Sequence, residues 1–266
     1  MIYLLLVPVL IFFAVFFLLP MGKLFLLGGS GELGWLVYLE VLTNAHYLQS
    51  MLSTLLVALA TTVCTLVISA IAGVFLQRNQ FWGRSLLTSL LTLPLAFPGV
   101  VVGFMIIMLA GRQGVIGQIT EGLGAGKLVF AYSLFGLFLG YLYFSIPRTI
   151  VTVMAAAEKM DTRLEEAARS LGAGHWRVVR DVMVPALKPA LISSGAICFA
   201  TAVSAFGTAF TLATRINVMP MVIYTEFTMS ANLAMAAALS FFLGAVTWLV
   251  LAVARSAGGS TVAAAG

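Results

Sequence analysis

The chain has 266 residues, of which 62% are hydrophobic and 9% are charged, and its formal net charge is +5. Soluble domains carry about 25% charged residues, so this composition excludes an ordinary soluble domain. A very apolar soluble helical bundle would need charged outer faces on its helices, and the sequence lacks them. Apolar stretches recur along the whole chain and predict an all-α, polytopic membrane protein. Topology explains the positive charge better than nucleic acid does.

Six apolar stretches are long enough to cross a membrane as helices. The first is bounded by Pro20; a signal peptide is the alternative, but the stretch lacks a basic start and a small-residue cleavage site. In the third, Pro94 and Pro98 predict a kink. A Gly-rich loop is expected over 111–127 and a disordered tail over 257–266. The predicted spans, within one transmembrane domain over 1–256, are 3–21, 50–76, 85–110, 128–146, 190–213 and 233–254.

Basic residues are unevenly distributed between the loops on the two sides of the membrane. With the amino terminus in the cytoplasm, ten of the 14 Lys and Arg residues face inward and four face outward. This distribution satisfies the positive-inside rule. It assigns the segment 158–188 to the cytoplasm; six of the basic residues and four of the nine acidic residues gather in residues 159–188 of this segment.

The segment 158–188 carries the signals of two short helices. Thr162 and Glu165 have the spacing of a capping box, so a helix is expected to begin at Thr162. Gly172 fits a left-handed C-cap, and a second helix is expected from His175 until Pro185 stops it. Glu and Arg side chains are expected to point outward. An amphipathic helix at the membrane interface, without a partner, is the alternative. One apolar stripe is predicted on the first helix: Leu164, Ala167, Ala168 and Leu171.

This pattern resembles the EAA loop of permease subunits in ATP-binding-cassette (ABC) importers of type I. The family pattern is Glu-Ala-Ala, three residues, Gly, then a stretch ending in an aliphatic residue and Pro. Val184 stands before Pro185 where Leu is commoner, and Gly174 stands where Ser often caps the second helix. The resemblance extends over most of the chain. The similar residues are Glu166-Ala167-Ala168, Gly172, Pro185, Ser53-Thr54-Leu55, Pro94, Pro98-Gly99, Ser145-Ile146-Pro147-Arg148 and Pro189.

The resemblance implies a six-helix, type I importer permease fold in a bacterial inner membrane. It implies a coupling helix that binds a cytoplasmic ABC ATPase dimer, a second permease (a related chain or a second copy) and an external solute-binding protein. The chain lacks a Walker-type glycine loop, so the partner ATPase would use ATP and Mg while this non-catalytic subunit binds no cofactor. The residues implied in coupling are Glu166, Ala167, Ala168, Gly172, His175, Trp176 and Pro185.

Hydroxyl residues recur at helical spacing in the fifth span, at Ser193, Thr201, Ser204, Thr208 and Thr211, and indicate one shared face. Ser and Thr in membrane helices often bond only their own backbone, which is the alternative. Ser204, Thr208 and Thr211, with Phe206, are the candidates for the translocation path. The resemblance leaves polyamines, oxyanions, phosphonates and ferric iron as solute classes. The lack of acids deep in the spans argues against a polycation site.

Two other classes of protein would show different features in the sequence. An ATP-independent channel or secondary transporter would predict intramembrane acids, broken-helix repeats or a selectivity loop. An intramembrane hydrolase would need a nucleophile–base pair or metal ligands inside the spans. Cys64 and Cys198 are best explained as packing residues, and His46 and His175 lie in separate loops, so no metal site is predicted.

Overall fold

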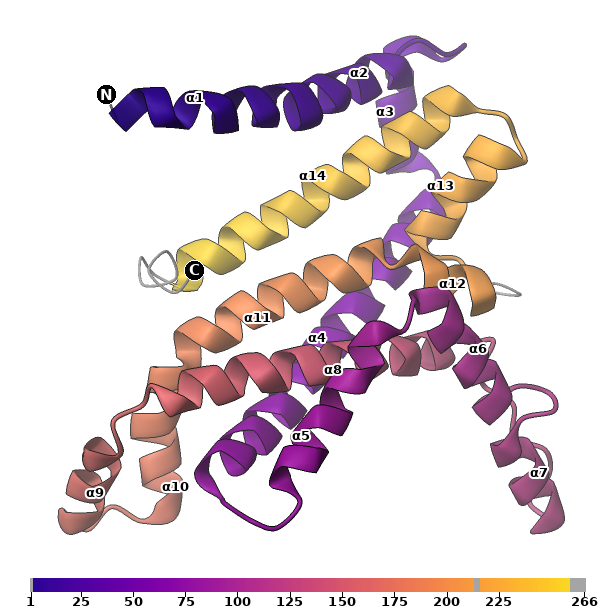
Figure 1. Ribbon diagram of the computed structural model, residues 1–266. Helices are drawn as coiled ribbons and strands as arrows, with labels where there is room; N and C mark the ends of the chain where they lie inside the picture. The colour runs from indigo at the N-terminus through magenta and orange to yellow at the C-terminus, as the bar shows by residue number, and fades with distance from the viewer. Residues whose placement is uncertain (1, 213–215, 259–266) are drawn as a thin grey trace. The chain divides into compact units, whose positions relative to one another are not determined.

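The computed structural model describes residues 2–212 and 216–258, and within these residues it is built from helices without β-strands (Figure 1). Of the predicted disordered tail, residues 257 and 258 instead belong to α14 (Leu233–Gly258), and the remainder lies outside the described residues. Six apolar helical segments among the described residues are long enough to span a membrane. They are Leu6–Gly28, Ala45–Arg78, Gly99–Gly122, Leu134–Glu158, His175–Ser204 and Leu233–Ser256.

The described residues within Met1–Thr54 and Asn217–Leu249 form one compact unit, and those within Leu55–Ile216 and Val250–Gly266 form another. In the first unit, the hydroxyl of Tyr38 donates to the carbonyl oxygen of Phe25 at 2.7 Å, and the Phe25 and Phe241 rings lie 4.9 Å apart. Its elements are α1 (Ile2–Phe13), a π-helical turn (Ala14–Leu18), α2 (Leu19–Gly28), a 3-10 turn (Gly34–Leu36), α3 (Val37–Thr43), the start of α4 (Ala45–Arg78), α13 (Met219–Thr228) and most of α14.

The second unit contains the remainder of α4 and the segment predicted to be cytoplasmic. In its core, Val153, Ala157 and Leu187 are buried and join α8 to α11. Its further helices are α5 (Arg84–Thr92), a 3-10 turn (Leu93–Ala96), α6 (Gly99–Ala110), α7 (Val115–Gly122), α8 (Leu134–Glu158), α9 (Thr162–Ser170), α10 (His175–Val178), a π-helical turn (Val179–Met183), α11 (Val184–Ser204) and α12 (Phe206–Leu212).

Two prolines that were predicted to bound helices lie inside longer helical segments, so the predicted ends at Pro20 and Pro185 are wrong. Each proline follows a π-helical turn by two residues, Ala14–Leu18 in one case and Val179–Met183 in the other. A proline lacks the N–H that an α-helix would bond to the carbonyl four residues earlier, and its ring clashes with that carbonyl. The wider π-turn bonds to the fifth preceding residue, so the helix continues past the proline.

The third and fourth predicted spans also need correction. The span 85–110 is two helices, α5 and α6, because Pro94 lies in a 3-10 turn and Phe97 is extended. The fourth span begins at Leu134, where the Ser133 hydroxyl accepts a hydrogen bond from the Gly136 N–H at 3.3 Å, and it continues to Glu158. Arg148 was expected in a loop but lies inside α8, ten residues before its last residue.

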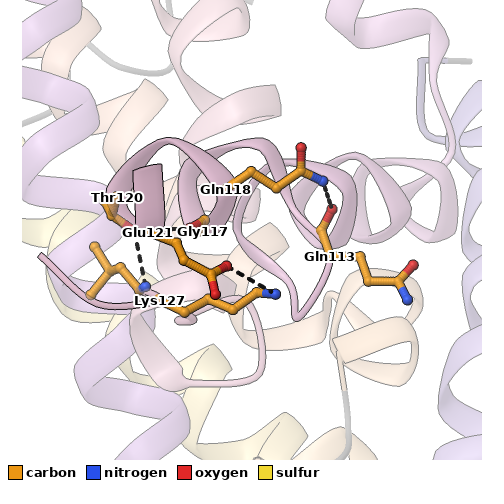
Figure 2. Close-up of polar contacts among 7 residues, drawn as sticks. Gln113, Gly117, Gln118, Thr120, Glu121 and Lys127 are labelled. Atoms are coloured by element: carbon orange, nitrogen blue, oxygen red, sulfur yellow. Dashed lines mark hydrogen bonds and ion pairs between the residues drawn. The ribbon is translucent and has the colours of Figure 1, made fainter. Parts of the chain in front are cut away.

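The predicted Gly-rich loop 111–127 contains the short helix α7 (Figure 2). The chain folds back along this helix, where the Thr120 hydroxyl accepts a hydrogen bond from the backbone N–H of Leu128 at 3.1 Å. Lys127 Nζ lies 3.6 Å from Glu121 Oε2 on the same side. These contacts stabilise an ordered segment where the glycine content predicted only a loop.

Candidate functional site

Helix α9 begins one residue after the side chain that caps it. Asp161, not Thr162, is the N-cap: its carboxylate accepts a hydrogen bond from the backbone N–H of Arg163 at 2.9 Å. The predicted capping box is therefore wrong, although the predicted first helical residue is correct. Glu165, which was expected to complete the box, points instead to another helix.

Glu165 forms an ion pair with Arg78, the last residue of α4. The side chains are 11% and 24% exposed, respectively, so most of the pair is shielded from water. Glu165 was expected to face outward, and this expectation is wrong. The two residues lie 87 positions apart in the sequence, so no local pattern links them.

The end of α9 agrees with the prediction. Gly172 has φ +82°, a left-handed conformation in which a side chain would be strained. Its N–H donates to the carbonyl of Arg169 at 2.9 Å, and the N–H of Ala173 donates to the carbonyl of Ala168 at 3.0 Å. This is the Schellman arrangement, which satisfies carbonyls that the helix end leaves free. Gly174 then precedes α10, and α9 and α10 lie together beside one end of α8 and α11 (Figure 1).

The turn between α9 and α10 presents apolar side chains to its surroundings. Leu171 is 88% exposed, Trp176 is 74% exposed and Leu164 is 59% exposed. Glu166 and His175 are also exposed, and Ala168 is half-buried. Exposed apolar side chains gathered in this way mark sites of protein or membrane contact. We call the exposed residues Leu164, Ala167, Leu171 and Trp176 the coupling face, after the role that the sequence resemblance implies for this segment.

The base of this segment is packed. Val178 at the end of α10 is buried, and Leu187 in α11 packs against Val153 and Ala157 of α8. Pro185 lies in the first turn of α11, within one continuous helical segment. The segment that bears the coupling face is therefore joined to α8 and α11, two apolar helices that pack against each other.

The hydroxyl face predicted across the fifth span is interrupted at Ala205, whose ψ of 91° separates α11 from α12. The hydroxyl of Tyr141 in α8 donates to the carbonyl of Ala205 at 2.9 Å and so stabilises the break. Helical spacing across this point no longer places Thr208 and Thr211 on the same face as Ser204. The prediction of one continuous face is wrong.

The four candidates for the translocation path lie in different surroundings. Ser204 and Phe206 are exposed on either side of the break. Thr208 is buried, and its hydroxyl donates to the carbonyl of Gly99 in α6 at 3.0 Å. Thr211 is half-buried, and its hydroxyl lies 2.9 Å from the carbonyl oxygen of Gly207 in α12 and 3.3 Å from that of Val100 in α6. Thr208 and Thr211 therefore stabilise the contact of α12 with α6.

Within the described residues, no group of three His, Cys, Asp or Glu side chains is arranged to hold a metal ion. Cys64 and Cys198 are free thiols.

The family described as "Binding-protein-dependent transport system inner membrane component" matches residues 65–258, and the chain belongs to this family. Its members are permease subunits of ABC importers, which are non-catalytic, multi-pass proteins of the inner membrane. The resemblance seen in the EAA-type loop is thereby confirmed at the level of the family.

Three transport permeases are similar in sequence to most of the chain. ModB, the molybdenum transport system permease protein of Escherichia coli, is 33% identical over 190 residues, which are 70% of this chain and 81% of ModB. CysT, the sulfate transport system permease protein of the same species, is 31% identical over 207 residues, 78% of this chain and 73% of CysT. A probable molybdenum ABC transporter permease protein of Haloferax volcanii is 30% identical over 212 residues, 80% of this chain and 74% of the relative.

Two solved structures share the fold at low sequence identity. A chain of a bacterial ABC transporter involved in the import of the acidic polysaccharide alginate matches with a TM-score of 0.78 and 16% identity, covering 97% of this chain and 94% of the other. The same kind of transporter in complex with an alginate pentasaccharide-bound periplasmic protein matches with a TM-score of 0.80 and 16% identity, covering 98% and 94%. The chain thus has the ABC importer permease fold.

Proposed function

We propose that this permease is the membrane subunit of an ATP-driven, binding-protein-dependent importer whose solute is a tetrahedral oxyanion such as molybdate or sulfate. The names of the relatives support the oxyanion class, because ModB and CysT are a molybdenum and a sulfate permease. Polyamines, phosphonates and ferric iron, which the loop pattern left open, find no such support among these relatives.

The mechanistic part of the proposal is that the coupling face binds the ATPase. Leu171 and Trp176 are exposed apolar side chains on a short charged turn, and burying them against a soluble partner would remove that area from water. Glu166, beside them, is exposed and available for an ionic contact. In the proposal this face docks into a groove of the ATPase subunit.

Movement of the docked segment would pass into the membrane by two routes. The ion pair of Arg78 with Glu165 links α9 to α4. The core of Val153, Ala157 and Leu187 links the base of the segment to α8 and α11. When ATP closes the paired ATPases, these links would reorient the helices around the solute path, for which Ser204 and Phe206 are the exposed candidates.

The full assembly would contain an ATPase dimer that uses ATP and Mg, a second permease chain and an external solute-binding protein. The neighbouring structure solved with a periplasmic protein supports the last of these partners. Residues 1–256 would act as one permease domain with a cytoplasmic amino terminus. With Arg148 inside α8, nine basic residues remain on the inner side against four on the outer side, so the charge bias still supports this orientation.

Affinity purification of the tagged chain from its native membrane, with mass spectrometry of the co-purifying proteins, tests the proposal. We expect an ABC ATPase in the wild-type sample and its loss from the Leu171→Ser variant. Leu123→Ser is the matched control, because Leu123 is also an exposed leucine after a short helix, at 78% exposure. Recovery of the chain without an ATPase would contradict the proposal. Equal ATPase recovery with Leu171→Ser and the wild type would contradict the docking role of the coupling face.

A further inference from the structure

A cavity of about 240 Å³ lies between α8 and α11 in the second unit. The residues that line it from α8 follow the 3.6-residue period, so they share the face of α8 that packs on α11. Seven of its nine lining residues carry a hydroxyl or a guanidinium: Ser145, Arg148, Thr149 and Thr152 from α8, with Ser193, Ser194 and Thr201 from α11.

Four of these side chains have hydrogen-bond donors that are not used by other described residues. The Ser145 hydroxyl is buried and has no hydrogen-bond partner there. Buried polar groups are nearly always paired, so an unpaired one beside a cavity indicates an occupant that the protein itself does not supply. No hydrogen bond within the described residues occupies the guanidinium of Arg148 or the hydroxyls of Thr149 and Ser193 either.

The other hydroxyls in the lining are already satisfied within their own helices. Ser194 donates to the carbonyl of Ala190 at 2.8 Å, and Thr201 donates to the carbonyl of Ile197 at 2.7 Å. Thr152 donates to the carbonyl of Arg148 at 3.1 Å. The lining of the cavity thus contains two kinds of polar side chain: those whose donors are free for a ligand, and hydroxyls that are bonded within their own helix.

Arg148 gives the cavity its charge, because the lining contains no Asp or Glu. It lies ten residues before the end of α8, about 15 Å along the helix axis. A charged side chain at such a position in a membrane-spanning helix is costly and is generally kept for function. A guanidinium offers a planar pair of N–H donors that matches two oxygens of an oxyanion.

The size of the cavity restricts its ligand. A cavity needs about 10–15 Å³ to hold one water, so about 240 Å³ has room for several waters. This volume accommodates a four-oxygen anion that keeps part of its hydration shell. Pockets for drug-sized ligands have about 300–1,000 Å³, so the volume of this cavity favours a smaller ligand.

We infer that the cavity between α8 and α11 is an oxyanion-binding site within the membrane part of the permease, with Arg148 and the Ser145 hydroxyl as its principal ligands. The inference rests on the proposed import of an oxyanion and adds a place where that anion is held after it leaves the binding protein. The phosphate of a membrane lipid has the same chemistry and is the other source of such a ligand.

Equilibrium binding of radiolabelled molybdate and sulfate to the assembled permease–ATPase complex tests the site, without binding protein and in discs of phosphatidylcholine alone. We expect saturable binding that weakens at least tenfold in Arg148→Gln and in Ser145→Ala. Thr152→Val is the matched control, because Thr152 lines the same cavity with its hydroxyl already bonded, and it is expected to bind within twofold of wild type. No saturable binding by the wild type, or unchanged binding by Arg148→Gln, would overturn the inference.

Two further measurements separate the sources of the ligand and the two proposals. If Arg148→Gln loses co-purifying anionic lipid, while molybdate and sulfate binding is unchanged, the ligand is a lipid phosphate and the inference fails. ATP hydrolysis stimulated by the binding protein is measured in every variant. Its presence in the wild type keeps the proposed function intact even where the anion site fails, and its absence there contradicts the proposed function itself.

Discussion

The ion pair between Arg78 and Glu165 offers a sharp test of how the coupling segment is held. An exposed ion pair contributes about 0–1 kcal/mol, and breaking a fully buried pair costs about 3–5 kcal/mol. The side chains of this pair are 24% and 11% exposed, which lies between these limits. We therefore expect Glu165→Gln to weaken the attachment of α9 to α4 by about 1–3 kcal/mol.

This loss converts into a measurable affinity. If α9 must keep its orientation in order to dock, a weakening of about 1–3 kcal/mol raises the dissociation constant of the permease for its ATPase roughly 5- to 150-fold. Titration of the ATPase onto the permease assembly in lipid discs measures this constant. A double-mutant cycle with Arg78→Gln isolates the pairwise contribution, because removal of both partners leaves no buried charge unpaired.

The exposed pair of Lys127 with Glu121 is the matched control (Figure 2). Its side chains are 42% and 62% exposed and 3.6 Å apart, so Glu121→Gln should leave ATPase affinity unchanged. A dissociation constant for Glu165→Gln within twofold of wild type would refute the reasoning. Strictly additive effects of the two single substitutions at Arg78 and Glu165 would refute it as well.

Three more predictions follow from the packing of the second unit. Gly172→Ala should lower ATPase affinity, since φ +82° costs a non-glycine residue about 1–2 kcal/mol, and a dissociation constant for the ATPase equal to that of the wild type would contradict this. Gly103→Val should reduce the yield of monodisperse protein in size-exclusion chromatography, because even a Cβ would lie 2.5 Å from Thr211 Cβ; a wild-type elution profile would contradict this. Tyr141→Phe should lower the thermal midpoint by removing the hydrogen bond to the Ala205 carbonyl, worth about 1 kcal/mol, and a midpoint equal to wild type would show the break to be stable without it.

The sequence predicts those features that depend on neighbouring residues. Apolar length alone predicts six membrane-spanning helices, and the described residues contain six apolar helical segments of that length. Gly172 is correctly predicted as the left-handed end of α9, because a C-cap glycine after an apolar stripe is a local signal. The family is also recognisable from the local order of Glu166, Gly172 and Pro185.

The features that the sequence did not predict depend on distant partners. Glu165 is spaced as a capping-box residue, but a cation 87 positions away competes for its carboxylate. Ala205 carries no sequence signal for a break, and the Tyr141 hydroxyl that stabilises it lies 64 positions away. Prolines usually stop helices, and the π-turns before Pro20 and Pro185 that remove this constraint have no single-residue signature.

The central claim is that ATP drives an oxyanion through this permease. Purified complex is reconstituted into liposomes so that the ATPase faces the lumen, ATP is enclosed, and external binding protein is supplied with radiolabelled molybdate or sulfate. We predict accumulation of the label inside the vesicles only when both hydrolysable ATP and binding protein are present. Accumulation driven by an ion gradient in the absence of ATP would identify a secondary transporter or channel and contradict the account, as would steady ATP hydrolysis without accumulation of either anion.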